Sequence, residues 1–418
     1  MDSPTLYALF SENGHSLSTD TRTIKPGDIY LGLRGEQFDG NAYAQAALEK
    51  GACFAVIDNP KYKADERYIL VENTLATLQA LAKLHREQFS IPVLAIGGSN
   101  GKTTTKELIH AVLSAKYRVH TTKGNLNNEI GVPLTILSMS SDTDIAVVEI
   151  GANHAREHTV LMDILSPTHV LVTNNGADHL EGFGSLAGVR SANKEIFDTA
   201  KTAHAFVNKD LTELVEDSST LQRTLYPTLS WRSASNIYAG INYGETSITS
   251  SLFGSFNEPN ILAAIAVGDF FSVPIESIQT AIQEYTPTLK RSQVLVHDDH
   301  TIIMDCYNAN PTSMELSLKD FFHTTSPGAR VIVVGDMFEV GDAEAMAHSN
   351  VLEFIAKEKG VADIVICVGP RFSKNSALFP FTFFESAAQA KPFYGALSLH
   401  NKTVFLKASR GIRLEEML

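Results

Sequence analysis

Apolar and polar positions alternate in blocks along this chain, and the blocks predict short buried strands separated by helices. Apolar runs rich in β-branched residues and bounded by polar turns are typical of strands inside a parallel sheet. In the central part of the chain such runs cover residues 93–97, 145–150, 169–173 and 205–207. Apolar residues at helical spacing occur between and after them, near residues 104–115, 191–199 and 260–271. This alternation predicts a mostly parallel α/β sheet within residues 91–297.

The same alternation occurs on both sides of this central part. After residue 298 we expect strands and helices in turn, with strands at 302–305, 331–334, 364–368 and 403–407 and helices at 311–322 and 346–359. Before residue 90 the pattern predicts strands at 29–33 and 54–57 and helices at 43–50 and 74–88. The polar stretch 210–255 is poorly periodic and predicts a small antiparallel excursion.

The fold class predicted is therefore α/β with three domains. They are a small mixed α/β domain (1–90), a central and mostly parallel sheet domain (91–297), and a C-terminal Rossmann-like α/β domain (298–418). A chain of 418 residues is too long for one ordinary core, which agrees with this division.

Composition and charge narrow the class of protein. Hydrophobic residues make up 44% and charged residues 19%, as in ordinary globular proteins. The net charge is −13, from 34 basic and 47 acidic residues, which argues against a general nucleic-acid or membrane surface. The three cysteines have the spacing of neither a metal site nor a disulfide framework, and no apolar run is long enough to span a bilayer. We expect a cytoplasmic protein with no membrane span.

The most informative motif is the glycine-rich stretch Gly98, Ser99, Asn100, Gly101, Lys102, Thr103 and Thr104. It lies between a predicted strand and a predicted helix, where free backbone N–H groups and the positive end of the helix dipole can hold phosphate oxygens. Lys102 can add a positive charge, and the Thr103 hydroxyl can bind Mg²⁺. Ile96 stands where the full motif has its first glycine, so a solvated glycine-rich turn is the alternative. The strand–loop–helix context favours a nucleotide-phosphate site.

Three further features of the central part can carry chemistry. Glu149 ends a buried strand and can hold a nucleotide-bound Mg²⁺, the alternative being a solvated strand-end carboxylate. His179 lies in a polar run and can ligate a metal or orient an acyl group, although a hydrogen-bonded surface histidine is the commoner outcome. The amide loop of Asn125, Asn127 and Asn128 can cap the next helix or bind a phosphate-bearing substrate.

In the C-terminal part, polar residues again follow two apolar strands. Residues 305–311 include Asn310 before a proline, and residues 335–341 include Asp336. We expect both stretches at one edge of the sheet, where they form a polar rim. The alternatives are a helix cap and a turn with solvated carboxylates.

Together these stretches resemble the Mur ligase family, and the resemblance extends over nearly the whole chain. It is carried by residues 18–22, 25–28 and 39–40, by 98–105, 124–128 and 179–181, and by 307–311, 335–337 and 407–410. The Tyr-Asn-Ala-Asn-Pro and Gly-Asp-Met elements are similar to those of the branch that adds D-alanyl-D-alanine. The resemblance implies a monomeric ATP- and Mg²⁺-dependent amide-forming ligase. Its reaction would join D-Ala-D-Ala to UDP-MurNAc-tripeptide through an acyl phosphate, in the last cytoplasmic step of peptidoglycan precursor synthesis.

The resemblance also implies roles for single residues. Thr103 and Glu149 would hold one Mg²⁺. His179 and Lys194 would hold a second, with Lys194 carbamylated by CO₂ as in the family. Spacing alone instead predicts that Lys194 is a solvated helical lysine. The glycine-rich stretch at residues 98–104, called the phosphate loop from here on, would bind ATP together with Asn257, Asn260, Arg291, Asn310 and Asp336. Contacts to the UDP-sugar substrate and the dipeptide would come from Asp20, Thr21, Arg22, Asn125, Asn127, Asn128, Ser409 and Arg410.

Some positions depart from the family pattern, and other functions stay open. Residues 153–157 lack the usual proline and Gly-Glu pair, which bears on local substrate contacts and not on the nucleotide chemistry. Ala408 stands where the family has a glycine. The alternatives are another Mur-type amino-acid ligase, a folylpolyglutamate synthetase, or a catalytically silent nucleotide-binding homologue. The missing Asp-Asn-Pro-Arg signature argues against a diaminopimelate-adding Mur ligase, and the uridine-type N-terminal part argues against a folylpolyglutamate synthetase. A silent homologue is disfavoured by the presence of Lys102, Glu149, His179 and Lys194.

Overall fold

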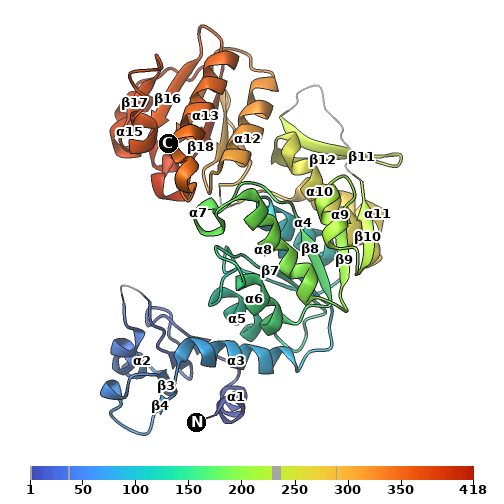
Figure 1. The fold of residues 1–418 in the computed structure, drawn as a ribbon, viewed down its shortest axis with the longest axis vertical. Helices are drawn as coiled ribbons and strands as arrows, with labels where there is room; N and C mark the ends of the chain where they lie inside the picture. The colour runs from blue at the N-terminus through green and yellow to red at the C-terminus, as the bar shows by residue number, and fades with distance from the viewer. Residues whose placement is uncertain (1, 36–37, 228–236, 289) are drawn as a thin grey trace.

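The structure is a computed structural model of the chain, which describes residues 2–35, 38–227, 237–288 and 290–418. The ribbon is elongated, with the N-terminal part at one end, the central part in the middle and the C-terminal part at the other end (Figure 1). Within the described residues, three sheets of four, six and eight strands occupy these parts in turn. The predicted α/β class is confirmed. Within the described ranges, no helix combines the length and the apolar character needed to cross a membrane.

The N-terminal part contains a small parallel sheet with the strand order β1-β2-β3-β4. Its strands are β1 (Leu17–Ser18), β2 (Ile29–Leu31), β3 (Phe54–Ile57) and β4 (Tyr68–Leu70). Its helices are α1 (Ser3–Glu12), α2 (Ala44–Glu49) and α3 (Thr74–Arg86). Helix α3 packs against the central part, where Arg86 Nε donates a hydrogen bond of 3.0 Å to the carbonyl of Leu165.

The central part is a six-stranded sheet, parallel throughout, with the order β10-β9-β8-β5-β7-β6. Its strands are β5 (Val93–Gly97), β6 (Val119–Thr121), β7 (Ile145–Glu149), β8 (His169–Val172), β9 (His204–Asn208) and β10 (Gln222–Tyr226). Its helices are α4 (Lys102–Ser114), α5 (Gly131–Leu137), α6 (Glu157–Leu165), α7 (Leu180–Phe183), α8 (Leu186–Thr199), α9 (Thr212–Asp217), α10 (Glu258–Phe270) and α11 (Ile275–Glu284).

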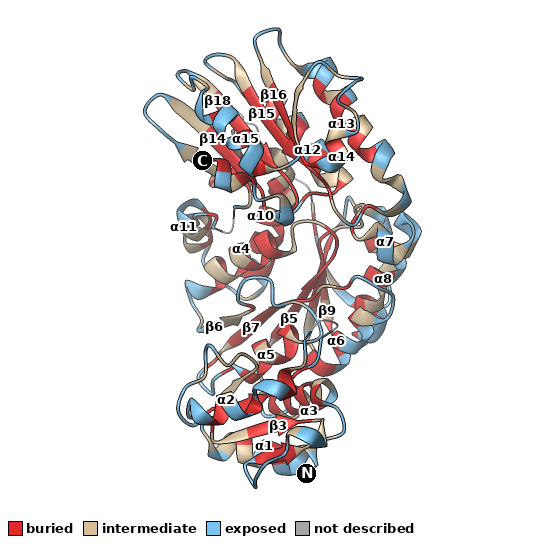
Figure 2. Cartoon of the chain, turned by 90° about the vertical axis from the view of Figure 1, so that its left-hand side faces the viewer, coloured by how far each residue is buried: buried red, intermediate tan, exposed pale blue. Residues whose placement is uncertain are grey.

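Strand β5 lies in the interior of this sheet and is buried at every position. Val93 and Ala95 pack into the core on one face, which includes residues of α3, α5, α6 and α8. Leu94 and Ile96 pack into the opposite core with α4, α10 and α11. Figure 2 shows these buried strands between partly exposed helices. Because both faces are covered, the carboxyl end of β5 is held rigidly, and the chain leaves it directly into the glycine-rich stretch.

The C-terminal part is a mixed eight-stranded sheet with the order β11-β12-β13-β14-β18-β15-β16-β17. The strands are β11 (Tyr238–Tyr243), β12 (Thr246–Phe253), β13 (Gln293–Val296), β14 (His300–Asp305), β15 (Arg330–Gly335), β16 (Ile364–Val368), β17 (Thr382–Phe384) and β18 (Lys402–Lys407). The helices are α12 (Pro311–His323), α13 (Glu344–Glu358), α14 (Pro370–Ser373) and α15 (Ala387–Gly395). Single 3-10 turns cover Gly40–Tyr43, Pro60–Tyr62, Ser255–Asn257, Gly341–Ala343, Arg410–Ile412 and Leu414–Met417.

This sheet begins earlier in the chain than residue 298. Strands β13 and β14 pair antiparallel, with Val294 opposite Ile303, so a boundary between residues 297 and 298 falls within the sheet. The antiparallel excursion predicted within 210–255 contains the hairpin of β11 and β12, which joins the edge of the same sheet at Leu252. Residues 228–236 of that stretch lie outside the described residues.

Candidate nucleotide and substrate site

A cavity of about 1160 Å³ lies where strand ends of the central and C-terminal sheets come together. Most of the residues predicted for the site line it, and they come from both sheets. They are Ser99, Asn100, Gly101, Lys102, Thr103, Thr104, Asn125, Asn127, Asn128, Glu149, His179, Asn257, Asn260, Arg291, Asn310 and Arg410.

The glycine-rich stretch forms the turn between β5 and α4 that its sequence predicts. Gly98 and Gly101 have φ angles of +112° and +86°, in the region where side chains other than glycine are strained. A Cβ atom at Gly98 would collide with Thr173, and one at Gly101 would collide with Asn260. Helix α4 starts at Lys102, so its first N–H groups face this turn and can bind an anion.

Lys102 lies folded against this loop. Its Nζ donates hydrogen bonds to the carbonyls of Gly98 at 2.6 Å and Ser99 at 3.1 Å, and it lies 3.7 Å from Asp178 Oδ2. Two further polar atoms of the loop, Ser99 Oγ and Asn100 Nδ2, are buried without a hydrogen-bond partner among the described residues. Unpaired buried polar groups are costly, so ligand oxygens are the partners that these donors fit.

Glu149 ends β7 as a buried carboxylate with one free oxygen. Its Oε1 accepts a hydrogen bond of 2.7 Å from Asn127 Nδ2, while Oε2 has no partner among the described residues. Thr103, which is also buried, lines the same cavity. Mg²⁺ prefers oxygen ligands and usually takes only one or two from the protein, the others being phosphate and water. Among residues the structure describes, no three His, Cys, Asp or Glu side chains cluster as a metal site. The Glu149 carboxylate and the Thr103 hydroxyl supply oxygen ligands of the kind and number that a nucleotide-bound Mg²⁺ takes from a protein.

The three asparagine side chains of the amide loop before α5 have different surroundings. Asn128 Oδ1 accepts hydrogen bonds from the N–H groups of Ile130 and Gly131, so it caps α5, as one of the two alternatives predicts. Asn127 instead orients Glu149, and Asn125 is exposed at the edge of the cavity.

His179 lies between two carboxylates that are not among the predicted site residues. Its Nδ1 is 2.8 Å from Glu339 Oε2, and its Nε2 is 3.8 Å from Asp178 Oδ2. Burial alone would lower the pKa of His179, but the hydrogen bond with Glu339 and the nearby negative charges raise it overall. The same hydrogen bond lowers the pKa of Glu339. Both acids lay within the polar runs that the sequence indicates, Asp178 next to His179 and Glu339 after the strand ending at Gly335.

Helix α12 contacts the phosphate loop through its N-terminus. Asn310 caps α12, because its Oδ1 accepts a hydrogen bond of 2.8 Å from the N–H of Ser313. Its Nδ2 donates to Asn100 Oδ1 at 2.8 Å and to Asp178 Oδ1 at 3.3 Å. Next to it, Thr312 Oγ1 accepts from the N–H of Ala177 at 3.0 Å. The C-terminal part is thus hydrogen-bonded to the phosphate loop and to the loop after β8.

Asn257 and Asn260 lie buried beside the phosphate loop, and their side chains bond within the protein. Asn260 Oδ1 accepts a hydrogen bond of 3.1 Å from Thr105, and its Nδ2 donates to Asn257 Oδ1 at 2.9 Å. Asn257 Nδ2 donates to Ser292 Oγ at 2.9 Å. These residues connect α4 and α10 to the segment that leads into β13.

Positive charge faces the cavity from the C-terminal side. The guanidinium carbons of Arg291 and Arg410 lie 3.8 Å and 5.3 Å from the ring centre of Tyr307. Neither arginine has an acidic partner among the residues the structure describes. Lys407, by contrast, is neutralised by Asp305, with Nζ and Oδ2 2.5 Å apart. The two arginines are therefore available to an anionic ligand.

Two predicted residues are used inside the C-terminal part instead. Asp336 is fully buried and accepts hydrogen bonds from the N–H groups of Arg371 and Phe372 at the start of α14. Asp336 is therefore a helix cap and does not line the cavity. Ser409 is also buried, where its Oγ donates to the carbonyl of Ala309 and accepts from the N–H of Phe338.

Lys194 is not brought to the cavity. Its Nζ donates to both oxygens of Asp198, at 2.6 Å and 2.8 Å, and its side chain is 41% exposed. The solvated helical lysine that spacing alone predicts is what the structure contains. The neighbouring residue Asn193 faces the interior instead.

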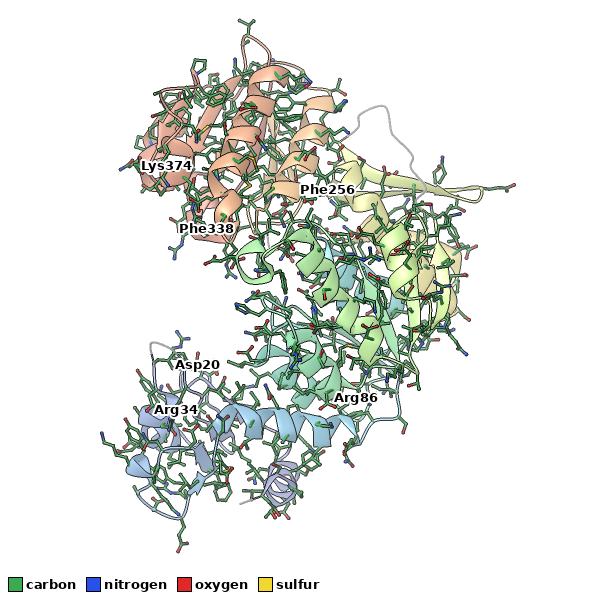
Figure 3. The ribbon with its side chains drawn as sticks, viewed as in Figure 1. Asp20, Arg34, Arg86, Phe256, Phe338 and Lys374 are labelled. Carbon is green, nitrogen blue, oxygen red and sulfur yellow. The ribbon has the colours of Figure 1, made fainter. Side chains whose placement is uncertain are left out.

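Asp20, Thr21 and Arg22 lie in the N-terminal part, away from this cavity (Figure 3, where Asp20 is labelled). Arg22 and Asp20 form an exposed ion pair of 2.6 Å, and hydrogen bonds from Arg22 lower the pKa of Asp20 to about 2. The carbonyl of Thr21 accepts a hydrogen bond of 2.9 Å from Lys50 Nζ. Their contact with a UDP-sugar substrate stays a prediction.

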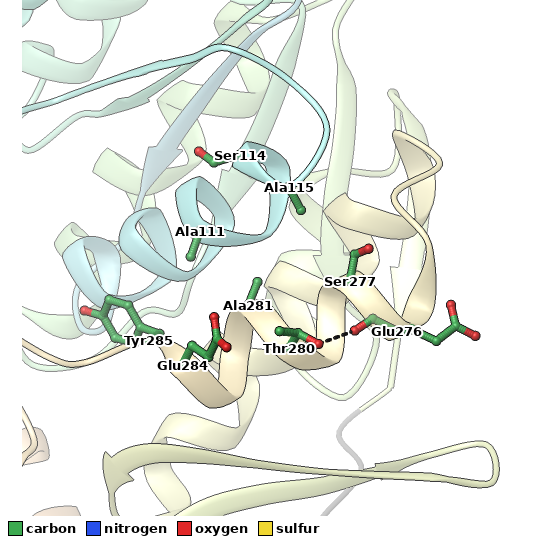
Figure 4. A pocket seen from close by; sticks show the side chains of 9 residues that line it. All are labelled: Ala111, Ser114, Ala115, Glu276, Ser277, Thr280, Ala281, Glu284 and Tyr285. Carbon is green, nitrogen blue, oxygen red and sulfur yellow. Dashed lines mark hydrogen bonds between the residues drawn. The ribbon is translucent and has the colours of Figure 1, made fainter.

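A second hollow, of about 580 Å³, lies between α4 and α11 (Figure 4). It is lined by small side chains such as Ala111, Ala115 and Ala281, with Glu276 and Glu284 at its edge. It is a more open groove than the main cavity, and it contains none of the residues that the sequence predicts for the site.

Comparison with known proteins agrees with this arrangement. Three family models match in order: the Mur ligase family catalytic domain at residues 13–86, the Mur ligase middle domain at 96–268, and the Mur ligase glutamate ligase domain at 290–391. The UDP-N-acetylmuramoyl-tripeptide–D-alanyl-D-alanine ligase of Bacillus subtilis is 32% identical, over 97% of this chain and 92% of that protein. The ligase of the same name from Escherichia coli is 33% identical, over 85% and 81%.

Solved structures give the same result. A crystal structure of MurF from Acinetobacter baumannii superposes with a TM-score of 0.86 at 27% identity, covering 96% of this chain and 92% of that one. The MurF ligase from Thermotoga maritima in complex with ADP has the same fold, with a TM-score of 0.84 at 24% identity and 96% of both chains covered.

Proposed function

This chain belongs to the Mur ligase family, and we propose that it joins D-alanyl-D-alanine to UDP-MurNAc-tripeptide in an ATP-dependent reaction. The product is UDP-MurNAc-pentapeptide. The proposal rests above all on the main cavity, where a phosphate loop and a free carboxylate oxygen of the central sheet face the arginines of the C-terminal sheet. The names of the relatives that match almost the whole chain give the substrates.

The chemistry needs an activated carboxylate, because a free carboxylate is a poor electrophile. The terminal carboxylate of the tripeptide attacks the γ-phosphorus of ATP, which forms an acyl phosphate and releases ADP. The amine of D-Ala-D-Ala then attacks the acyl carbon, inorganic phosphate leaves, and the nitrogen loses a proton as the amide forms. Such reactions are accelerated chiefly by positioning and by neutralising phosphate charge.

The residues of the phosphate loop supply that neutralisation on the central side. Lys102 and the N–H groups at the start of α4 would bind the terminal phosphates, and the Ser99 hydroxyl is free to donate to them. Thr103 and Glu149 would hold Mg²⁺, which adds positive charge beside the phosphates when bound. His179 would face the same phosphates from the next strand end.

The remaining contacts are assigned by position. Asn257 and Asn260 would form part of the cavity wall next to adenine. Their side-chain amides are already hydrogen-bonded within the protein, so we assign them to the shape of this wall. Arg291 and Asn310 would face ATP from the C-terminal part, and Arg410 would face the incoming dipeptide. The amide loop at residues 125–128, together with residues 20–22, would contact the UDP-sugar substrate.

We also propose a cytoplasmic monomer. The described cysteines, Cys53, Cys306 and Cys367, are free thiols, as a reducing compartment allows.

Product analysis tests this function. The purified chain is incubated with ATP, Mg²⁺, D-Ala-D-Ala and UDP-MurNAc-tripeptide carrying either lysine or diaminopimelate, and the products are identified by mass spectrometry. We expect UDP-MurNAc-pentapeptide and one ADP per product, and almost none with Lys102→Ala. A product with a single amino acid would instead indicate another Mur-type ligase, and nucleotide binding without any product would indicate a silent homologue.

A further inference from the structure

The buried face of α8 passes through Asn193 and leaves Lys194 outside. The buried residues of this helix are Val189, Ala192, Asn193, Ile196 and Phe197, at the spacing of one helix face. The buried stripe is two residues wide, Ala192 with Asn193 and then Ile196 with Phe197, and Lys194 lies beyond its edge with a side chain that is 41% exposed. Lys194 instead pairs with Asp198 one turn later.

Asn193 is connected to the phosphate loop through one more asparagine. Asn193 is 5% exposed, and its Nδ2 donates to Asn175 Oδ1 at 2.9 Å and to the carbonyl of Asn174 at 3.4 Å. Asn174 in turn bonds Asn100 twice: its Nδ2 donates to the Asn100 carbonyl at 2.8 Å, and its Oδ1 accepts from the Asn100 N–H at 3.2 Å. Asn193 thus supports Asn174, which in turn holds the phosphate loop at Asn100.

The rotation of α8 is fixed on both sides of Lys194. Asn193 is held by Asn174 and Asn175, and Glu195 is held by the N-terminus of α6. The carboxylate of Glu195 accepts hydrogen bonds from the N–H of Arg156 at 2.7 Å and from the N–H and Oγ1 of Thr159 at 3.1 Å and 3.0 Å. Turning Lys194 toward the cavity would break both sets of bonds and expose the apolar residues of the buried face.

We propose that α8 contributes to the site through Asn193, an uncharged positioning residue, and that Lys194 remains an unmodified surface lysine. This inference rests on the proposed function, and it means that the ligase works without the carbamylated lysine that the family resemblance implies. A carbamate would have added a negative charge near the phosphates. Here the acidic groups beside His179 are Asp178 and Glu339, from the central and C-terminal parts.

Spectroscopy tests the lysine directly. The wild-type protein and Lys194→Ala are equilibrated with ¹³C-bicarbonate, Mg²⁺ and ADP, and their ¹³C NMR spectra are compared in the carbamate region. We expect the two spectra to be the same. A carbamate signal present in the wild type and absent from Lys194→Ala would overturn the proposal.

Variants test Asn193. Lys194→Ala should keep kcat and the KM for each substrate within about twofold of the wild type, in the presence or absence of added bicarbonate. Asn193→Ala should raise the KM for ATP, and the calorimetric Kd for ADP, about tenfold, because the loss of one or two hydrogen bonds loosens the Asn174 contact with the loop. The KM for D-Ala-D-Ala should stay unchanged. A purely structural role would lower only the fraction of folded enzyme and leave the Kd for ADP as it is.

The outcomes also separate this inference from the proposed function. Loss of ligation in Lys194→Ala, restored by a small carboxylic acid in solution, would contradict the inference while supporting the ligase. An inactive wild type would count against the ligase, but the NMR comparison and the ADP titrations would still decide the roles of Lys194 and Asn193. If Asn193→Ala fails to fold, the Lys194→Ala spectra and kinetics decide the main claim alone.

Discussion

Asn310 Nδ2 donates a hydrogen bond to Asn100 Oδ1 over 2.8 Å, which joins residues 210 positions apart in the chain. The contact brings the cap of α12 in the C-terminal part directly onto the phosphate loop of the central part. Because Asn310 also donates to Asp178, a single side chain links three segments of the site. Nucleotide binding and the placement of the C-terminal part should therefore affect each other.

Replacing Asn310 separates its two roles. Asn310→Ala removes both the cap of α12 and the bond to Asn100, so it should raise the KM for ATP several-fold and lower stability by about 1 kcal/mol. Asn310→Ser keeps a capping oxygen but is too short to reach Asn100. It should therefore keep the stability and share the KM effect. Equal ATP affinity in Asn310→Ser and the wild type would show that the bridge does not support nucleotide binding.

Glu149→Gln should leave the fold intact and remove Mg²⁺-dependent activity. The amide keeps the shape of the side chain but removes the charge of the free Oε2. We expect kcat to fall at least ~100-fold and the Mg²⁺ concentration for half-maximal activity to rise. The melting temperature should stay equal or increase, because an unpaired buried charge is removed. A Mg²⁺ titration of phosphate release measures the first effect, and an unchanged titration curve would exclude Glu149 as a ligand.

Lys106 is a fully buried lysine that the proposed chemistry does not use. Its Nζ donates to the carbonyls of Thr122 at 2.6 Å and Gly124 at 3.2 Å, in the segment that leads to the amide loop, and it pairs with Glu107 at 2.9 Å. Lys106→Met leaves these groups without their donor, so it should lower the free energy of unfolding by about 1–3 kcal/mol. It should also raise the Mg²⁺ requirement, because Thr122 Oγ1 accepts from the N–H of Glu149.

The matched control is Lys201→Met, at an exposed lysine, which should change neither quantity. Denaturant unfolding followed by a Mg²⁺ titration measures both. If the Lys106 and Lys201 variants had the same stability, the buried lysine would have no structural role.

His158 should make the stability of the protein fall in mild acid. The imidazole is buried in α6, and burial lowers its pKa from 6.5 to about 4. Since the folded state binds this proton less readily than the unfolded state, stability is unaffected above pH 6.5 and is lost as the pH falls from 6.5 toward 4. The loss from this group is at most about 3 kcal/mol.

Urea unfolding at several pH values between 7 and 4.5 measures this dependence. His158→Gln should flatten the curve, whereas His323→Gln, at an exposed histidine, should leave it unchanged. Equal slopes for the wild type and His158→Gln would contradict the assignment.

Local sequence signals predicted much of the fold. The run at 93–97 is β5 and the run at 364–368 is β16, because each is an apolar β-branched segment that a glycine ends or follows. Helix α3 begins at Thr74 after its Asn73 cap, and α12 begins at Pro311 after Asn310. These signals lie within a few residues of the element that they specify, so they can be read without tertiary information.

Which side chains face the site was less predictable. The orientation of Lys194 depends on the rotation of α8, which Asn175 and the start of α6 fix from elsewhere in the chain. Asp336 carries a carboxylate, a common ligand group, yet this carboxylate caps α14 by accepting hydrogen bonds from residues more than thirty positions later in the chain. The pairing of His179 with Glu339 likewise joins two sheets. Such contacts arise from packing between distant segments, and no local pattern encodes them.

The most direct test of the ligase account is phosphate release by the wild-type chain with ATP, Mg²⁺ and UDP-MurNAc-tripeptide, measured with and without D-Ala-D-Ala. We expect sustained release only when both substrates are present, because phosphate leaves when the dipeptide amine attacks the acyl phosphate. Release that is independent of D-Ala-D-Ala, or no release with any amine, would contradict the account.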